Sequence, residues 1–376
     1  MKYYIIAGEA SGDLHGSNLV KQLHQLDAAA NIRCWGGDLM ESEGATLVRH
    51  YKDLAFMGFV EVIMNLRTIL KNIKFCKQDI LAHKPDILIL IDYPGFNIRI
   101  AEWAKKEGIK TVYYISPQIW AWKENRVHTI KKSVDKMLVI LPFEKDFYSK
   151  WEYKVEYVGH PLIEVIEDYK ATHPLLQHRG KKVIALLPGS RQQEIKIKLP
   201  VMLEVSKAFP EYEFVVAKAP GQEDSFYESF LASYANVSAA AGKTYEILNQ
   251  ATAALVTSGT ATLETALFGV PEVVCYKGNP ISYQIAKWVI KVKYISLVNL
   301  IMDKPVVKEL IQHEMTTENC IEELKDLLEN PVRKKQLDRD YKDLKDLLSL
   351  GGNASANAAK IIYDFGSMVT KRLHSQ

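Results

Sequence analysis

Two stretches of the sequence place glycines and small polar residues directly after an apolar run, where a strand would end and a helix begin. One is Gly8–Gly16, which contains Glu9, Ser11 and Asp13; the other is Thr257–Glu264. Glycines let the backbone approach a ligand closely, and the start of the following helix favours an anion or a polar sugar. Both are therefore candidate ligand loops. In the first, the dinucleotide spacing G-x-G-x-x-G is absent, and a plain turn with Ser11 and Asp13 capping the helix is the alternative.

The Thr257–Glu264 loop is the more specific of the two. The backbone amides and hydroxyls of Ser258, Gly259 and Thr260 can cradle a diphosphate. Glu264 follows about one helical turn later, where its carboxylate could accept hydrogen bonds from both hydroxyls of a ribose. A Ser/Thr helix cap with a stabilising glutamate explains the same residues, but the presence of two paired loops favours a ligand site.

A third loop, Leu187–Glu194, follows the first apolar run in the second half of the chain. Gly189 and Ser190 can offer backbone amides, and Arg191 carries a fork of donors that suits a phosphate. This pattern favours a phosphate contact over a solvated surface arginine.

Asp92 ends the apolar run Asp86–Ile91 and is followed by a Pro-Gly turn. A carboxylate at the end of a buried strand lies at the ligand-binding edge of a sheet, where it could act as a general base on an acceptor hydroxyl. A turn-forming aspartate bonded to nearby backbone amides is an equally good interpretation.

The loop Tyr114–Trp122 also follows an apolar run and carries Trp120 and Trp122. Their rings suit a sugar or an acyl chain, and they suit the protein core equally well. Both interpretations stay open at this point.

The elements that must position these loops are short β-rich runs that alternate with helical stretches. Most of the runs are apolar at every position, which is typical of strands covered on both faces. The predicted strands are Tyr3–Ala7, Ile32–Trp35, Asp86–Ile91, Thr111–Ile115, Lys136–Ile140, Val155–Val158, Val183–Leu187, Glu213–Ala217, Ala253–Val256 and Glu272–Tyr276, and predicted helices include Leu14–Leu26, Arg67–His83 and Ile98–Glu107. This rhythm predicts an α/β protein with doubly wound parallel sheets.

The alternation of strands and helices is interrupted once, at Gly159–Lys181, which we interpret as a linker with one helix. Helices dominate from Val306 onward. Since 376 residues exceed one ordinary core, we predict a first domain at residues 1–165, a second at 166–350, and a C-terminal helix at 351–376 whose packing on the first domain is left open. The carboxyl ends of both sheets would then face a shared cleft.

The composition argues against several classes of function. With 48 basic and 45 acidic residues the net charge is only +3, so nothing global indicates binding of nucleic acid. The four cysteines contain no C-x-x-C pair, which favours reduced, buried thiols over zinc or disulfides. The D-x-D triplet Asp338–Asp340 stands in a charged helical stretch, so we expect no metal site and no cofactor.

The apolar segment Phe56–Leu66 is a candidate membrane contact. No stretch reaches the roughly 18 apolar residues that a transmembrane helix needs, and the N-terminal run is too short for a secretory signal, so we expect a cytoplasmic protein. Large apolar side chains beside basic ones suit a membrane surface or an acyl-chain groove, and a core-packed helix pair explains the segment equally well. The basic residues that follow it are Arg67, Lys71, Lys74 and Lys77, and a second basic stretch is Lys287–Lys308.

Seven motifs, taken in order, make the chain resemble lipid-A-disaccharide synthases nearly from end to end. Each is modest alone, and their shared order makes the match specific. They are Gly8–Asp13, Met57–Val62, Ile91–Asn97, Ser116–Trp122, Leu187–Arg191, Ser258–Glu264 and Ser296–Leu300. Many members have an aspartate where this chain has Gly95, so that position cannot be essential here, whereas Asn97 is retained.

The resemblance implies a glycosyltransferase with two Rossmann-like domains, the GT-B architecture. Its reaction would join UDP-2,3-diacylglucosamine to 2,3-diacylglucosamine 1-phosphate (lipid X), giving a β-1,6-linked disaccharide phosphate and UDP at the cytosolic face of the inner membrane. By the same resemblance, Asp92 is the catalytic aspartate. The predicted substrate-binding residues are Glu9, Ser11, Asn97, Gly189, Ser190, Arg191, Ser258, Gly259, Thr260, Glu264 and Asn299.

An α-linked donor and a β-linked product imply one in-line displacement with inversion. Asp92 would take the proton of the acceptor hydroxyl, and Arg191 with the Ser258–Thr260 amides would stabilise the departing diphosphate in place of a metal. The first domain would then be the acceptor side and the second would bind the UDP-sugar. The alternatives are a UDP-sugar epimerase or cell-wall glycosyltransferase of the same fold, or a non-catalytic nucleotide-sugar-binding protein. A homodimer is left open.

Overall fold

The structure is a computed structural model that describes residues 1–54, 66–174, 180–219, 222–279, 283–284 and 292–374. Two compact units divide the chain: residues 1–161 together with 348–376, and residues 162–347. Each unit holds one sheet in which every strand pair is parallel. The predicted fold class, two doubly wound parallel sheets, is therefore confirmed.

The sheet of the first unit has seven strands in the order β3-β2-β1-β4-β5-β6-β7. Because side chains alternate across a strand, Tyr4 and Ile6 of β1 enter one core, whereas Tyr3 and Ile5 enter the other. Both faces are covered, which is why these strands are apolar at every position. The strand bounds are β1 Lys2–Ala7, β2 Asn31–Gly36, β3 Thr46–His50, β4 Ile87–Ile91, β5 Thr111–Tyr114, β6 Lys136–Val139 and β7 Glu156–Tyr157.

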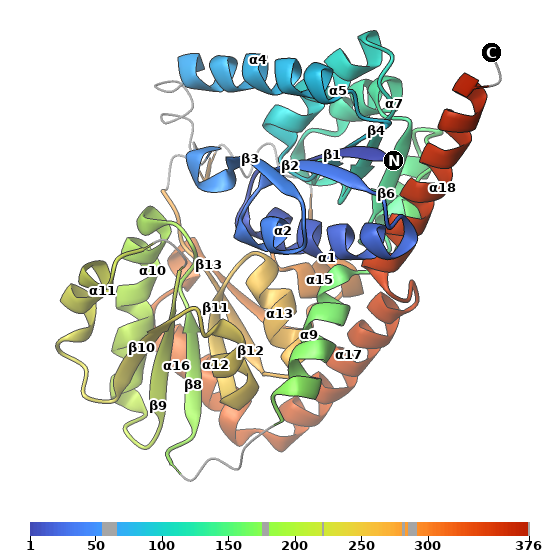
Figure 1. Ribbon diagram of the computed structural model, residues 1–376. Helices are drawn as coiled ribbons and strands as arrows, with labels where there is room; N and C mark the ends of the chain where they lie inside the picture. Colours follow the sequence, from blue (N-terminus) through green and yellow to red (C-terminus); the bar gives the residue numbers. More distant parts are fainter. Residues whose placement is uncertain (55–65, 175–179, 220–221, 280–282, 285–291, 375–376) are drawn as a thin grey trace. The chain divides into compact units, whose positions relative to one another are not determined.

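Helices cover both faces of this sheet (Figure 1). One face packs against α1 (Ala10–Leu26), α2 (Asp38–Ser42) and α18 (Ala354–His374). The other packs against α4 (Leu66–His83), α5 (Pro94–Lys106), α7 (Val127–Ser133) and α8 (Glu144–Ser149). The short helices α6 (Ile119–Trp122), η1 (Tyr51–Leu54) and η2 (Glu124–Arg126) lie in the loops.

The chain returns to the first unit for its last helix, α18, which packs against α1. The segment that follows β7 and the segment that precedes α18 contact each other through the backbones of Gly159 and Gly351. A Cβ on Gly351 would lie only 2.3 Å from the Cα of Gly159. No larger side chain fits at this crossing, so the two connections are held side by side.

The sheet of the second unit has six strands in the order β10-β9-β8-β11-β12-β13. Its strand bounds are β8 Val183–Leu187, β9 Glu213–Lys218, β10 Val237–Ala241, β11 Ala251–Thr257, β12 Glu272–Tyr276 and β13 Lys308–Ile311. Its helices are α9 Pro161–Thr172, α10 Gln192–Val205, α11 Asp224–Leu231, α12 Thr244–Gln250, α13 Thr260–Phe268, α15 Leu297–Met302, α16 Thr317–Glu329 and α17 Pro331–Ser349, with the short helices η3 Ser206–Ala208 and η4 Gln312–Glu314.

Three strands that the sequence pattern did not predict are all edge strands: β3, β10 and β13. An edge strand has one neighbour and more solvent, so it can carry polar or small residues and lacks the continuous apolar run. For β13 the prediction of helices from Val306 onward was wrong. Helix α1 also begins at Ala10 rather than at Leu14, which brings the glycine-containing loop into its first turn.

All four cysteines are buried, as predicted, and none is paired in a disulfide. Within the described part of the chain, no helix has the length and apolar character needed to cross a membrane.

Candidate active site

Both sheets reverse their strand order once, between β1 and β4 in the first unit and between β8 and β11 in the second. Ligands of doubly wound sheets bind beyond the carboxyl ends of the strands at such a switch point. These four strands are followed by the loops Gly8–Glu9, Asp92–Tyr93, Pro188–Arg191 and Ser258–Gly259, which lead into α1, α5, α10 and α13. The predicted ligand loops therefore occupy the switch points of the two sheets.

The Asp92 turn has an unusual backbone. Asp92 (φ 43°) and Tyr93 (φ 48°) are both left-handed, a conformation that residues other than glycine seldom adopt. Pro94 then opens α5, at a position where its missing N–H removes no helix bond. The Tyr93 ring covers Gly8, where a Cβ would come within 2.3 Å of it. Close packing on a glycine thus fixes the turn that carries the carboxylate.

The carboxylate of Asp92 is electrostatically perturbed. It is half-buried at the end of β4, and Glu9 lies at the end of the neighbouring strand β1. Burial, and then the negative charge of Glu9, raise the pKa of Asp92 to about 7. A carboxyl group that titrates near neutrality can accept a proton and release it again, which is what a general base requires.

Asn97, a predicted substrate-binding residue, is fully buried beneath this turn. Its Nδ2 donates to the backbone carbonyls of Ile91 at 3.1 Å and Asp92 at 2.8 Å. The Tyr113 hydroxyl donates to the same Asp92 carbonyl. These bonds make Asn97 a residue that positions Asp92, and its contact with substrate stays a prediction.

Ser11 and Asp13 lie in the first turn of α1. Ser11 is exposed there. Asp13 is buried, and its carboxylate accepts from the backbone N–H groups of Gly37 at 2.7 Å and Met40 at 3.1 Å. The interpretation that Asp13 caps its own helix was therefore wrong, because it caps the start of α2 instead.

The two tryptophans after β5 have different environments. Trp120 is buried, and its Nε1 donates to the buried carboxylate of Glu144 at 3.2 Å. Glu144 also accepts from the N–H of Leu141 at 2.9 Å, so it ties the tryptophan to the end of β6. Trp122 is 45% exposed. Of the two open interpretations, core packing holds for Trp120, while Trp122 is accessible to a ligand.

In the second unit, Gly189 makes a turn that excludes other residues. Its φ is 114°, and a Cβ there would lie 2.7 Å from Oε2 of Glu194. Ser190 and Arg191 follow in exposed positions, and Arg191 is the N-cap residue of α10. Nη1 of Arg191 donates to Oε1 of Glu194 at 3.5 Å. A guanidinium at the start of a helix, beside an open glycine turn, suits a phosphate.

A buried lysine lies under the same turn. Lys198 is only 2% exposed, and its Nζ lies 3.6 Å from Oε2 of Glu194. Burial lowers the pKa of Lys198, and the charge of Glu194 opposes that shift. A Cβ on Gly189 would approach this Nζ to 3.5 Å and Thr257 to 3.3 Å, so the turn after β8 packs against the end of β11 and a buried lysine.

The loop after β11 presents the start of a helix. Gly259 has φ 145° and precedes α13, and both it and Thr260 are exposed. The Ser258 hydroxyl donates to the backbone carbonyl of Ile295 at 2.7 Å. That hydroxyl therefore holds the loop. Contact between a diphosphate and the backbone amides at the start of α13 stays a prediction.

Glu264 and Asn299, the remaining predicted donor-side residues, both have protein partners. The Tyr245 hydroxyl donates to Oε1 of Glu264 at 2.8 Å, and burial raises the pKa of Glu264. Asn299 is buried; its Nδ2 donates to the Val307 carbonyl and its Oδ1 accepts from the Val307 N–H, both at 2.9 Å. The amide of Asn299 thus braces the segment before β13, and ligand contact by either residue stays a prediction.

The sequence patterns missed Tyr93, Glu144 and Lys198. Glu144 follows strand β6 by a few residues, so the rule that chemistry follows strands could have found it. Lys198 lies inside a helix among apolar residues, and nothing in its neighbours distinguishes it from a surface lysine.

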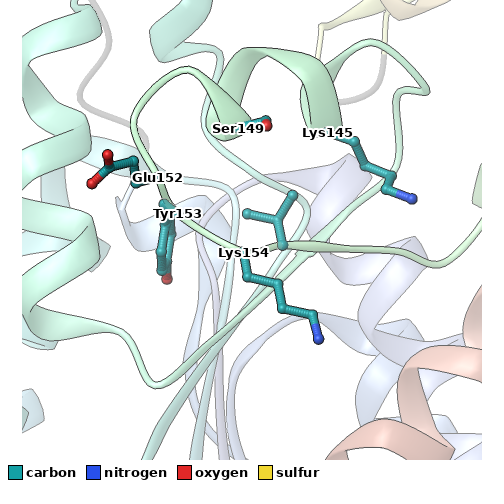
Figure 2. A pocket seen from close by; sticks show the side chains of 6 residues that line it. Lys145, Ser149, Glu152, Tyr153 and Lys154 are labelled. Carbon is teal, nitrogen blue, oxygen red and sulfur yellow. The ribbon is translucent and has the colours of Figure 1, made fainter.

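A pocket of about 350 Å³ in the first unit is shown in Figure 2. Most of its lining comes from Glu152–Val155, which directly precede β7. It therefore lies toward the amino edge of the sheet, opposite the Asp92 edge, and has no part in the candidate site.

The model of the lipid-A-disaccharide synthetase family matches residues 3–362. The chain belongs to the lipid-A-disaccharide synthase family. The lipid-A-disaccharide synthase of Geobacter metallireducens is 38% identical over 369 residues, 96% of each chain. That of Syntrophus aciditrophicus is 39% identical over 364 residues, 94% of this chain and 95% of the relative. The predicted function, sugar transfer by an enzyme of lipid A biosynthesis, is confirmed, and the other UDP-sugar enzymes and the non-catalytic binding protein are not favoured.

Solved structures share the fold at low identity. The UDP-GlcNAc 2-epimerase from Neisseria meningitidis bound to UDP-GlcNAc has a TM-score of 0.65 at 14% identity, over 97% of this chain and 99% of the other. The calicheamicin glycosyltransferase has a TM-score of 0.62 at 15% identity, over 97% of each chain. These structural similarities place the chain in the GT-B architecture. They carry no information about its substrate.

Proposed function

We propose that the chain joins UDP-2,3-diacylglucosamine to 2,3-diacylglucosamine 1-phosphate with inversion at the anomeric carbon. The β-1,6-linked disaccharide phosphate and UDP are the products. The observation that carries the mechanism is Asp92, a half-buried carboxyl group at the switch point of the first sheet with a pKa of about 7. Its carboxylate accepts the proton of the acceptor 6-hydroxyl as that oxygen attacks.

The second unit supplies the donor side in this proposal. Arg191 and the amides at the start of α13 stabilise the charge that builds on the departing diphosphate. Lys198 adds a buried positive charge next to Glu194, 3.6 Å away. The assignment is supported by Gly189, whose φ of 114° makes the turn that leaves Ser190 and Arg191 exposed at the start of α10.

The first unit is the acceptor domain and the second the UDP-sugar domain, with the predicted boundary near residue 165. Glu9 and Ser11 then lie on the acceptor side with Asp92. The support for this assignment is chemical: the first switch point carries carboxylates and the second carries donors and cations.

A turnover assay with both substrates tests this function. The purified chain, UDP-2,3-diacylglucosamine and lipid X should yield UDP and the tetraacyl disaccharide phosphate by mass spectrometry. Isomerisation of the UDP-sugar would favour an epimerase, and UDP binding without any product would favour a binding protein. Repeating the assay with EDTA asks whether arginine and backbone amides suffice, since activity that disappears with chelation contradicts that part of the mechanism.

We also propose that the chain rests on the inner membrane through the beginning of α4. The apolar segment Phe56–Leu66, which motivated this prediction, lies outside the residues whose side chains the structure describes. The adjacent residues Arg67, Leu70, Lys71 and Lys74 are all exposed. Their spacing of three and four puts them on one stripe of α4, basic with an apolar side chain, which suits an anionic lipid surface.

Sedimentation with phosphatidylglycerol vesicles tests the membrane contact. Because each lysine near such a surface contributes about 1 kcal/mol, the double change Lys71→Glu and Lys74→Glu should weaken binding by about 10-fold or more. The pair Lys334→Glu and Lys335→Glu on α17 is the matched control and should bind normally. Equal binding by both double variants contradicts the proposed surface.

A further inference from the structure

Trp122, Lys123 and Arg126 form an exposed cluster that the proposed mechanism leaves without a task. Trp122 ends α6 and is 45% exposed. The Nζ of Lys123 lies 4.1 Å from the centre of its ring, and the Cζ of Arg126 lies 5.7 Å from the same centre. Two cations therefore gather over one accessible indole.

In the described part of the chain, no carboxylate neutralises these two cations. Among the described residues neither Lys123 nor Arg126 forms an ion pair with an acidic side chain. Both are half-buried. Burial, and then the charge of Arg126, lower the pKa of Lys123. Keeping two like charges close together and partly out of water costs free energy, and an anion bound between them would relieve that cost.

The local structure fixes where the cluster points. The buried Trp120 anchors α6 through its hydrogen bond to Glu144. Two residues further on, Trp122 reaches the surface. The backbone N–H of Arg126 donates to the Lys123 carbonyl at 3.0 Å, which closes the short helix η2. These two hydrogen bonds fix the backbone that carries the cluster, so its three side chains are not independent surface residues.

The cluster belongs to the same edge of the sheet as Asp92. It follows β5, which pairs directly with β4. Tyr113 of β5 donates its hydroxyl to the Asp92 carbonyl. Burial and the Asp92 charge raise the pKa of Tyr113, and Arg126 lies near enough for its charge to oppose them. The cluster therefore follows the strand next to the one that carries Asp92, and Tyr113 lies within reach of both Asp92 and Arg126.

We propose that Trp122, Lys123 and Arg126 bind the phosphate monoester of the acyl-sugar acceptor. This inference rests on the proposed function and adds the group by which the acceptor is recognised. A phosphate monoester carries nearly two negative charges and three acceptor oxygens, which matches a lysine and an arginine. The indole provides an apolar face for the sugar ring, so its hydroxyl can reach Asp92 while the phosphate is held by the cations.

The anionic headgroup of a membrane lipid also presents a phosphate to cations, and in phosphatidylglycerol this phosphate is a diester with one negative charge. The position beside Asp92 favours the acceptor, because a headgroup site is needed at the membrane surface and has no reason to adjoin the base. The experiment therefore compares the two sources directly.

The test measures binding and turnover with two acceptors, 2,3-diacylglucosamine 1-phosphate and its dephosphorylated form. In the double variant Lys123→Ala, Arg126→Ala, the KM and the directly measured Kd for the phosphorylated acceptor should rise about 10-fold or more. Those for the dephosphorylated form and for the UDP-sugar should stay within about 2-fold of the unchanged protein. The double conservative variant Lys123→Arg, Arg126→Lys should recover most of the affinity.

The double variant Lys131→Ala, Lys132→Ala on α7 is the charge-matched control, since both lysines are exposed, and it should leave the Kd and KM of both acceptors unchanged. Circular dichroism checks folding of each variant. Direct calorimetric binding keeps the test independent of turnover: if no product forms with any acceptor, the proposed function fails, while a phosphate-dependent difference in Kd still supports this site. Equal weakening of both acceptors, or no weakening, overturns it. So does a double variant that loses only its sedimentation with phosphatidylglycerol vesicles, which would assign the cluster to a lipid headgroup.

Discussion

The switch points of the two sheets have the same topology and opposite chemistry. In the first unit the loops after β1 and β4 carry Glu9 and Asp92, whose mutual repulsion helps to raise the pKa of Asp92 to about 7. In the second unit the loops after β8 and β11 carry Arg191 and the start of α13, with buried Lys198 beneath them. In the proposed mechanism, the same sheet topology therefore provides a proton acceptor in one unit and an anion site in the other.

The difference teaches that the parallel sheet decides where chemistry occurs, and that side chains at a few positions decide which chemistry. In both units a glycine permits close packing at the edge: Gly8 under the Tyr93 ring and Gly189 above Glu194. The charged groups beside each glycine differ: Glu9 and Asp92 follow the strands of the first unit, whereas Arg191 and Lys198 surround the single carboxylate of Glu194 in the second. If this comparison holds, variants of the two sites should separate cleanly in their effects.

The largest effect should come from Asp92→Asn. Loss of a general base typically costs about 10²–10⁴ in rate, so kcat should fall by that amount while the Kd for UDP stays unchanged. Steady-state kinetics and calorimetry measure the two quantities. Glu102→Gln, an exposed carboxylate on α5, is the control and should keep full activity. A near-normal kcat in Asp92→Asn would contradict the assignment of Asp92 as the general base.

Arg191→Ala should produce the converse pattern. A hydrogen bond to a charged group contributes about 1.5–3 kcal/mol, so UDP affinity should weaken by about 10- to 100-fold. Acceptor affinity should not change, because the residue belongs to the other unit. Calorimetry with UDP alone measures this, with Lys207→Ala, an exposed lysine that pairs with Glu204, as control. Unchanged UDP affinity in Arg191→Ala would contradict the donor assignment.

The pH profile should distinguish the units with a smaller effect. Because Asp92 acts as a base and its pKa is raised to about 7, kcat/KM should fall about tenfold per unit as pH drops below 7. Since the negative charge of Glu9 contributes to raising that pKa, Glu9→Gln should move the acid limb to lower pH. Arg191→Ala should leave the limb where it is. A limb that does not move in Glu9→Gln contradicts the coupling between the two carboxylates.

The smallest effects should come from Asn97 and Asn299, the buried asparagines of the two predicted sites. Asn97 and Asn299 bond mainly to backbone, so replacement of either by alanine leaves buried groups unsatisfied and should cost about 1–3 kcal/mol of stability. Thermal unfolding measures this, and the exposed Asn125→Ala is the control. Loss of UDP affinity in Asn299→Ala without loss of stability would indicate that Asn299 contacts the substrate directly.

The sequence predicted the central strands well because they are apolar on both faces, and it missed the edge strands β3, β10 and β13 because they are not. It also located Asp92, Arg191 and the Thr257–Glu264 loop, since residues that follow a buried strand lie at the ligand edge. It could not assign Asp13, whose partners at Gly37 and Met40 are more than twenty residues away. Long-range hydrogen bonds of this kind leave no periodic signal.

Residue types and their spacing by themselves determined the α/β class, the two-part organisation and the family. Only the tertiary structure decided which loops share a switch point, because strand order depends on how the helices cross and not on local pattern. It also decided that the pKa of Asp92 is raised, because burial and the approach of Glu9 arise only when β1 and β4 pair. The same packing buries Trp120 in the core and leaves Trp122 exposed beside two cations. The Trp-Ala-Trp spacing alone could not make this distinction.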